Sequence, residues 1–222
     1  LGSHSRVENA GELRTFPFSV HRHLGLKVRG IMAPELLTSL ARLDYSQLGA
    51  EFLTCLPQRM WQSGFLTDKN PLNYLYAGII ARALPGAKIV HIRRNPMDTC
   101  FANFKQLFAG GAYMHSYDLQ GLGDHYCAYS SLMELWRDTL KERFIELRYE
   151  DLVADSETQL RQVLSACELD WESGVLDFHQ RGSSIGTASF AQASQPVYAT
   201  SVDKWRHFET HLQPLEQSLL DA

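Results

Sequence analysis

The segment KIVHIRRNPMDTCFANF, residues 88–104, constrains the fold of this chain more than any other. Its first half is rich in β-branched apolar residues, which favours a buried strand. Asn95 and Pro96 follow, a pair typical of a helix N-terminus, because asparagine accepts hydrogen bonds from free backbone N–H groups and proline suits the first helical position. Apolar residues then recur at helical spacing from Cys100 to Phe108. The segment therefore predicts a strand, a turn and a helix, which indicate an α/β fold.

Arg93 and Arg94 lie at the predicted turn, directly before the helix. A helix N-terminus presents unpaired N–H groups and partial positive charge, and a guanidinium adds donors that match phosphate oxygens. The combination indicates a binding site for a phosphorylated ligand. An isolated arginine pair at such a turn is more often an ordinary surface feature, so the assignment depends on other motifs.

Length and composition limit the class of protein. With 222 residues, 45% of them hydrophobic and 21% charged, the chain fits one soluble α/β domain. The formal charge of −4 argues against bulk nucleic-acid binding, although a local basic pocket is compatible with it. The longest apolar run, residues 74–81, is too short to span a bilayer, and no signal peptide opens the chain. We therefore expect a cytoplasmic protein without a membrane or nucleic-acid partner, and the sequence leaves its oligomeric state open.

The four cysteines are far apart in the sequence and form no C-x-x-C pair. Three of them occupy apolar positions of predicted helices. This pattern predicts buried free thiols in a reducing compartment.

Other elements follow from periodicity and capping signals. Asp68-Lys69-Asn70-Pro71 repeats the cap-and-proline pattern and predicts a helix start. Ser156 with Gln159 predicts a capping box. Residues 1–17 are predicted to be irregular, with no strand before Glu12, and residues 181–200 to form a long polar loop. The remaining predictions are helices over residues 34–43, 45–56 and 124–141, a loop over residues 109–123 and a strand over residues 144–149.

Three motifs occur together: Arg94-Asn95-Pro96, Tyr149-Glu150-Asp151-Leu152 and Ser201-Val202-Asp203-Lys204-Trp205. With them the chain resembles the sulfotransferase family, above all the bacterial domains that follow tetratricopeptide repeats and the tyrosylprotein sulfotransferases. The resemblance implies a single domain over residues 1–222, with an α/β fold whose central, mostly parallel sheet is flanked by helices, as in P-loop nucleotide kinases.

The implied reaction moves a sulfuryl group from 3′-phosphoadenosine 5′-phosphosulfate (PAPS) to an acceptor hydroxyl and releases 3′-phosphoadenosine 5′-phosphate (PAP), without a metal. The acceptor is a protein or a small molecule: a protein tyrosine, a polysaccharide and a small phenol all remain open. The resemblance also aligns residues 1–16 with the part of the family that directly follows the phosphosulfate loop and the first helix. We therefore expect the first strand and this loop, and any repeats, upstream of Leu1.

The resemblance assigns residues to the cofactor. Arg94 would bind the 3′-phosphate of PAPS, and the family usually adds a serine eight residues later, where this chain has Ala102. Lys105 or Gln106 on the next turn is a candidate substitute. Tyr149 would line the nucleotide pocket. The alternative is that Tyr149 has only a structural role, as a half-buried aromatic residue of the core.

Lys204 resembles, with Trp205, a C-terminal clamp over the cofactor; as an isolated pair they would be an exposed lysine beside a packed tryptophan. Two histidines, His207 and His211, stand four residues apart in the same region. The spacing allows a metal from one helix face, but no third ligand is evident, and we interpret them as part of an amphipathic surface helix.

The resemblance also assigns residues to the transferred group. Glu12 would be the general base and Arg14 would bind an acidic acceptor, although an isolated exposed residue of either type is commonly solvated. Lys69 would reach the bridging oxygen between sulfate and 5′-phosphate and stabilise charge on the leaving group. Ser189 would assist the same leaving group, with Ser194 as a competing candidate.

Two other functions stay open at this stage. A kinase of related fold would share the phosphate chemistry, but neither a Walker lysine motif nor a magnesium-binding acid is evident. A non-catalytic module that binds PAP or another nucleotide is the second alternative, motivated by Ala102 and by the missing phosphosulfate loop.

Overall fold

The computed structural model describes residues 1–220 apart from residues 28–33, 58–59, 61–62, 109–110 and 179–199. The chain divides into two compact units. Unit 1 comprises residues 1–89 and 161–196, and unit 2 comprises residues 90–160 and 197–222. The prediction of one domain over the whole chain stays a prediction.

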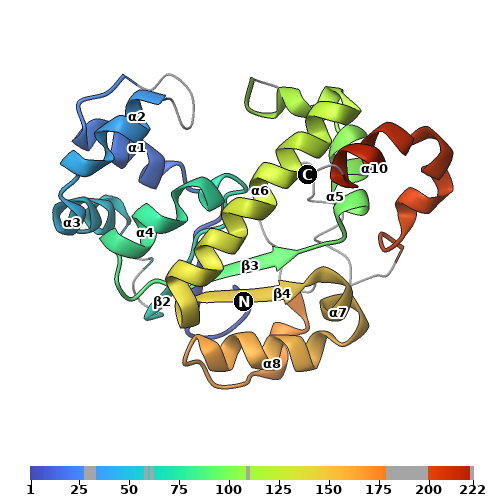
Figure 1. Cartoon of the computed structure of the whole chain (residues 1–222). Helices are drawn as coiled ribbons and strands as arrows, with labels where there is room; N and C mark the ends of the chain where they lie inside the picture. Colours follow the sequence, from blue (N-terminus) through green and yellow to red (C-terminus); the bar gives the residue numbers. More distant parts are fainter. Residues whose placement is uncertain (28–33, 58–59, 61–62, 109–110, 179–199, 221–222) are drawn as a thin grey trace. The chain divides into compact units, whose positions relative to one another are not determined.

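Unit 1 contains two short parallel strands, β1 (Val7–Asn9) and β2 (Phe65–Thr67), in the register that pairs Val7 with Phe65 and Asn9 with Thr67 (Figure 1). The prediction that no strand precedes Glu12 is therefore wrong. Three residues are too few to show alternation in a sequence, and this strand depends on its partner, which lies far along the chain.

The rest of unit 1 is mainly helical. The bounds of these helices are α1 Thr15–His23, α2 Pro34–Ser39, α3 Tyr45–Cys55 and α4 Ala77–Ala83, with 3-10 helices η1 Leu40–Arg42, η3 Asn73–Tyr76 and η6 Ser173–Val175. Phe16, Val20, Leu48 and Tyr76 are among the fully buried residues of their shared core. Gly49 permits the close approach of α3 to α4, because a Cβ there would collide with the carbonyl oxygen of Ala83.

The predicted helix start at Asp68–Pro71 is wrong. Asp68, Lys69 and Asn70 belong to no regular element, a turn follows at Pro71 and Leu72, and the first helical residue is Asn73. Asn70 Oδ1 accepts a hydrogen bond from Leu72 N (3.0 Å), while Asp68 Oδ1 accepts one from Leu13 N (3.0 Å). The capping residues therefore bind other backbone groups, and Lys69 lies in a loop after β2 rather than at a helix start.

Unit 2 is built on β3 (Ile89–Arg93) and β4 (Phe144–Arg148), which pair in a second sheet, and the arrows in Figure 1 show them parallel. The other elements are α5 Pro96–Phe104, η4 Gly111–Tyr117, α6 Leu119–Leu140, η5 Lys141–Arg143, α7 Tyr149–Ala154, η8 Lys204–His211 and α10 Gln213–Leu220. Helix α8 (Ser156–Ala166) leads the chain back to unit 1. The core of unit 2 includes Met97, Phe101, Leu122, Trp205 and Leu215.

The strand, turn and helix predicted for residues 88–104 are confirmed. Asn95 caps α5, since its Oδ1 accepts a hydrogen bond from Asp98 N (3.1 Å), and Pro96 opens the helix. The helix ends at Phe104, so its predicted continuation to Phe108 is wrong, and Leu107 is 84% exposed. The α/β class with parallel strands is also confirmed, in the form of two two-stranded sheets among the described residues.

Three smaller predictions need correction. Helix α6 begins at Leu119, because Asp118 caps it, so part of the predicted loop is helical. Helix α8 is capped by Asp155, whose Oδ1 accepts a hydrogen bond from Thr158 N (3.1 Å), and not by Ser156. Of the four cysteines, which are all free, only Cys100 is buried, and Cys55 is exposed.

None of the helices in the described part of the chain is long and apolar enough to cross a bilayer.

Candidate active site

The parallel pairing of β1 with β2 brings Glu12 and Lys69 together in unit 1. Beyond the strand ends, Ala10 N donates to Thr67 O (2.9 Å) and Lys69 N donates to Gly11 O (2.8 Å). Gly11 has φ +72°, a left-handed conformation that glycine adopts without strain. Both side chains then follow the carboxyl ends of parallel strands, where α/β folds commonly bind ligands. The Lys69 ammonium forms an ion pair with Glu12 Oε1, and the Lys69 side chain remains 65% exposed.

Asp68 holds the backbone beside Glu12, a role that the sequence did not reveal. Its Oδ1 accepts a hydrogen bond from Leu13 N (3.0 Å), and its Oδ2 accepts one from the side chain of Asn73 (3.3 Å). Asn70 Nδ2 donates to Leu13 O (3.2 Å), so both backbone groups of Leu13 are bound. Burial raises the pKa of Asp68, although the hydrogen bonds from Leu13 and Asn73 oppose this shift.

The other two residues predicted near the transferred group give less information. Arg14 is exposed and directly precedes α1, two residues after Glu12. Ser189 and its competitor Ser194 lie outside the described residues.

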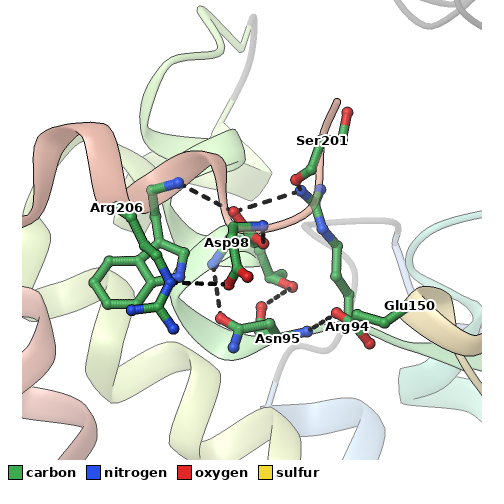
Figure 2. Close-up of polar contacts among 9 residues, drawn as sticks. Arg94, Asn95, Asp98, Glu150, Ser201 and Arg206 are labelled. Carbon is green, nitrogen blue, oxygen red and sulfur yellow. Dashed lines mark hydrogen bonds and ion pairs between the residues drawn. The ribbon is translucent and has the colours of Figure 1, made fainter. Parts of the chain in front are cut away.

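In unit 2, Arg94 follows β3 and its guanidinium is surrounded by residues from three segments (Figure 2). Its Nη2 donates to the carbonyl oxygen of Ser201 and lies 3.8 Å from Asp98 Oδ1. Its Cζ lies 5.0 Å from the centre of the Tyr149 ring, within the range of a cation–π contact. Arg94 Nε is buried and has no hydrogen-bond acceptor among the described residues.

Asp98 connects α5 to the C-terminal segment, and sequence reasoning missed it. It is 1% exposed, and its two oxygens accept hydrogen bonds from the backbone N–H groups of Asp203 (2.7 Å) and Trp205 (3.2 Å). Glu150 was missed as well: its Oε1 accepts a hydrogen bond from Asn95 N (2.8 Å), which ties the start of α7 to the turn (Figure 2). For Asp98 the sequence did offer a signal, because an acidic residue in the first turn of α5, four residues after Arg94, can lie next to that arginine.

Lys105 and Lys204 add positive charge to the Arg94 region. Lys105 Nζ lies 4.4 Å from the centre of the Phe101 ring. The Lys105 side chain therefore points back toward the N-terminus of α5, as side chains on helices commonly do. Burial lowers the pKa of Lys105, and the charges of Lys204 and Arg94 lower it further. Ala102 is half-buried on α5, and Lys204 is the exposed first residue of η8. We call Arg94, Lys105 and Lys204 the cationic group.

A separate polar network joins β3, β4 and α6. His91 Nδ1 lies 3.0 Å from Glu146 Oε2, the same oxygen that accepts a hydrogen bond from Arg137 Nη2 (2.8 Å). His91 Nε2 contacts the hydroxyl of Tyr129. Burial lowers the pKa of His91, while Glu146 opposes this shift.

The predicted surface positions of His207 and His211 are exposed, as expected, on the 3-10 helix η8. Within the described ranges, no cluster of three or more acidic, histidine or cysteine side chains is arranged to bind a metal.

Sequence comparison decides the family. The model of the sulfotransferase family matches residues 1–173. The chain belongs to the sulfotransferase family. It is 30% identical over 230 residues to an uncharacterized protein of Aquifex aeolicus (strain VF5), covering 100% of this chain and 30% of that protein. Cytosolic sulfotransferase 15 of Arabidopsis thaliana is 29% identical over 122 residues, covering 48% of this chain and 33% of that protein. This sulfotransferase chain thus spans about a third of the length of these relatives.

Solved structures share the fold. The sulfotransferase domain of the Synechococcus PCC 7002 olefin synthase aligns with a TM-score of 0.64 at 20% identity and covers 99% of this chain and 86% of its own. The sulfotransferase domain of the curacin biosynthetic pathway aligns with a TM-score of 0.58 at 16% identity, over 99% of this chain and 89% of its own. The similarity confirms the P-loop-like sulfotransferase fold.

Each group of residues fits one requirement of sulfuryl transfer. The cationic group offers several N–H donors, among them the buried Arg94 Nε, which has no acceptor among the described residues although Asp98 lies 3.8 Å from Arg94 Nη2. Such a group can bind a phosphate. The pair of Glu12 and Lys69 offers a carboxylate that can accept a proton and an ammonium that can stabilise an anion.

Proposed function

We propose that this chain is the catalytic part of a PAPS-dependent sulfotransferase that sulfates an acceptor hydroxyl and releases PAP. The observation that carries the proposal is the cationic group after β3, with the buried Arg94 Nε that lacks an acceptor among the described residues. A phosphate would supply that acceptor, and PAPS carries a 3′-phosphate that distinguishes it from ordinary adenine nucleotides.

In this proposal Glu12 and Lys69 act on the transferred group. Glu12 accepts the proton of the acceptor hydroxyl, and Oε2 is the acceptor atom, because Lys69 already engages Oε1. The hydroxyl oxygen forms a bond to sulfur as the bond from sulfur to the 5′-phosphate oxygen breaks, and the electron pair of that bond stays on PAP. The ammonium of Lys69 stabilises the charge that develops on this leaving oxygen. We retain Ser189 as a further donor to the leaving group and Arg14 as a contact for an acidic acceptor.

Arg94, Tyr149 and the two lysines of the cationic group act on the nucleotide. Arg94 binds the 3′-phosphate, and the stacking of its guanidinium on Tyr149 (5.0 Å) fixes its orientation. Lys204 and Lys105 supply further positive charge. We propose that Lys105 replaces the donor that Ala102 lacks, because a lysine on the next turn of the helix reaches the same side of α5.

The test uses the natural protein that contains these residues. We expect it to transfer label from ³⁵S-PAPS to at least one acceptor of a panel that includes tyrosine peptides, small phenols and oligosaccharides. We also expect it to bind PAP by calorimetry, with ATP competing poorly. If the protein binds PAP but modifies no acceptor of any class, the non-catalytic alternative that Ala102 suggests gains support. Preference for ATP over PAP would refute the proposal and favour a kinase.

A further inference from the structure

We infer that Asp98 is a positioning residue, which fixes Lys204 for 3′-phosphate binding by holding the backbone on both sides of it. The inference rests on the proposed function, since it names the residue that organises the phosphate site. It concerns contacts within unit 2 alone (Figure 2).

The hydrogen bonds of Asp98 bracket Lys204 in the sequence. Asp98 Oδ2 accepts from Asp203 N (2.7 Å) and Oδ1 accepts from Trp205 N (3.2 Å), so the residue before Lys204 and the residue after it are both bound. Trp205 is itself 7% exposed in the core of unit 2. The backbone of Lys204 therefore has little freedom, while its side chain remains exposed and available to a ligand.

The segment requires such support because its conformation is unfavourable. Asp203 has φ +56°, in the left-handed region that non-glycine residues enter only at a cost. A strained backbone persists only where surrounding contacts stabilise it. Here those contacts are the bond from Asp203 N to Asp98 and the ion pair between Asp203 Oδ1 and Arg206 Nε (3.3 Å).

A carboxylate is required at position 98, because both of its oxygens face N–H donors. An ionised acid accepts hydrogen bonds at both oxygens, whereas an amide of the same shape accepts at one and donates at the other. Asp98→Asn would therefore place an N–H group against a backbone N–H group in a buried setting, where an unsatisfied donor is costly. The substitution should release one side of Lys204 without changing the volume of the side chain.

Asp98 also lies 3.8 Å from Arg94, so a direct effect on Arg94 must be separated from an effect through Lys204. A double-mutant cycle makes this separation. If Asp98 acts through Lys204, Asp98→Asn has little left to disrupt once Lys204 is replaced by Met. If Asp98 acts on Arg94 directly, the loss persists in that background.

The experiment measures the affinity of the natural protein for PAP and for adenosine 5′-phosphate, which lacks the 3′-phosphate. We expect Asp98→Asn to weaken PAP binding about tenfold, a loss of about 1.4 kcal/mol. We expect adenosine 5′-phosphate binding to change less than about twofold, and PAP binding to fall less than about twofold further when Asp98→Asn is added to Lys204→Met. A general structural defect would weaken both nucleotides.

A second variant disrupts the same contact from the exposed side, in case Asp98→Asn does not fold. Asp203→Pro removes the N–H that Asp98 binds and is incompatible with φ +56°, whereas Asp203→Gly retains the N–H and tolerates that angle. We expect the proline variant to lose PAP affinity as Asp98→Asn does and the glycine variant to retain it. Asp118→Ala is the control, because Asp118 caps α6 of the same unit and alanine cannot accept the capping hydrogen bond. It should lower Tm without changing PAP affinity.

The inference alone is overturned if the unsubstituted protein binds PAP and Lys204→Met weakens binding, while Asp98→Asn and Asp203→Pro do not. It is also overturned if the loss from Asp98→Asn is undiminished in the Lys204→Met background. An unsubstituted protein that does not bind PAP refutes the proposed function itself, and the inference with it.

Discussion

The ammonium of Lys69 forms an ion pair with the carboxylate of Glu12, although the two residues are 57 positions apart in the chain. The parallel register of β1 and β2 produces this contact, because Asn9 pairs with Thr67 and both strands end there. The loop that carries Glu12 is then held by Asp68 through Leu13 N. A carboxylate and an ammonium from distant segments therefore lie side by side, which is the arrangement that the proposed roles of Glu12 and Lys69 require.

The first prediction separates the roles of this pair. We expect Glu12→Gln to lower kcat by about 10²- to 10⁴-fold, the usual contribution of a general base, while PAP affinity stays nearly unchanged. Lys69→Ala should reduce both kcat and PAP affinity, because an ammonium near the leaving oxygen also contacts the bound nucleotide. Turnover and calorimetry are measured separately, and Glu35→Gln on α2 is the control, since it removes another carboxylate of unit 1. Near-normal kcat in Glu12→Gln would place the base elsewhere.

The second prediction concerns Arg94 and its neighbour. Arg94→Ala should cost about 1.5 to 3 kcal/mol of PAP binding, the range for hydrogen bonds to a charged group. Arg93→Ala is the matched control, because the Arg93 side chain is 56% exposed and lies 3.9 Å from Glu146 rather than in the cationic group. Calorimetry with PAP compares the two variants. Equal losses would mean that general positive charge, and not the Arg94 guanidinium, accounts for binding.

The sequence predicted an element correctly where that element depends on contacts between residues close together in the chain. The Asn95 cap, the first helical position of Pro96 and the strand before them were predicted, because each depends on contacts within a few residues. The same pattern at Asp68–Pro71 predicted the wrong element. Capping side chains bind any free N–H within reach, and there Asp68 binds Leu13 N from a distant segment.

The site residues that the sequence did not reveal have partners far along the chain. Asp98 binds Asp203 N, which is 105 positions away, and Glu150 binds Asn95 N, which is 55 positions away. Only the folded chain brings these groups together. Arg94, Tyr149 and Lys204 were assigned to the site through motif resemblance, and these assignments stay predictions.

The third prediction tests whether Lys105 replaces the donor that Ala102 lacks. We expect Lys105→Met to weaken PAP binding by about 0.5 to 1.5 kcal/mol, the net contribution of one hydrogen bond. Ala102→Ser should tighten binding by a similar amount, and it should do so more strongly in the Lys105→Met background, where no lysine competes for the phosphate. Calorimetry with PAP measures all three variants. If the Lys105→Met variant binds PAP as tightly as the unsubstituted protein does, Lys105 does not replace the missing donor.

The fourth prediction concerns the polar network at His91 and the dependence of stability on pH. Burial lowers the pKa of His91 below its unfolded value of about 6.5, so the unfolded chain binds more protons in the interval between the two values. The contribution of His91 to the free energy of unfolding is therefore fully present above about pH 6.5, and it falls as the pH drops below this value. Glu146, Arg137, Arg93 and Tyr129 face the imidazole, and the pKa of Glu146 is lowered as well, because hydrogen bonds from Arg137 and His91 outweigh its burial.

We expect Tm to decrease between pH 7.5 and pH 5.5, above the range in which Glu146 titrates. The scale is about 2 to 4 °C for each kcal/mol in a chain of this length. His91→Gln should make this decrease smaller without abolishing it, because burial also lowers the pKa values of His115 and His125, whose rings stack at 3.6 Å. Calorimetric scans across this range provide the measurement, and a slope in His91→Gln equal to that of the unsubstituted protein would show that His91 does not contribute.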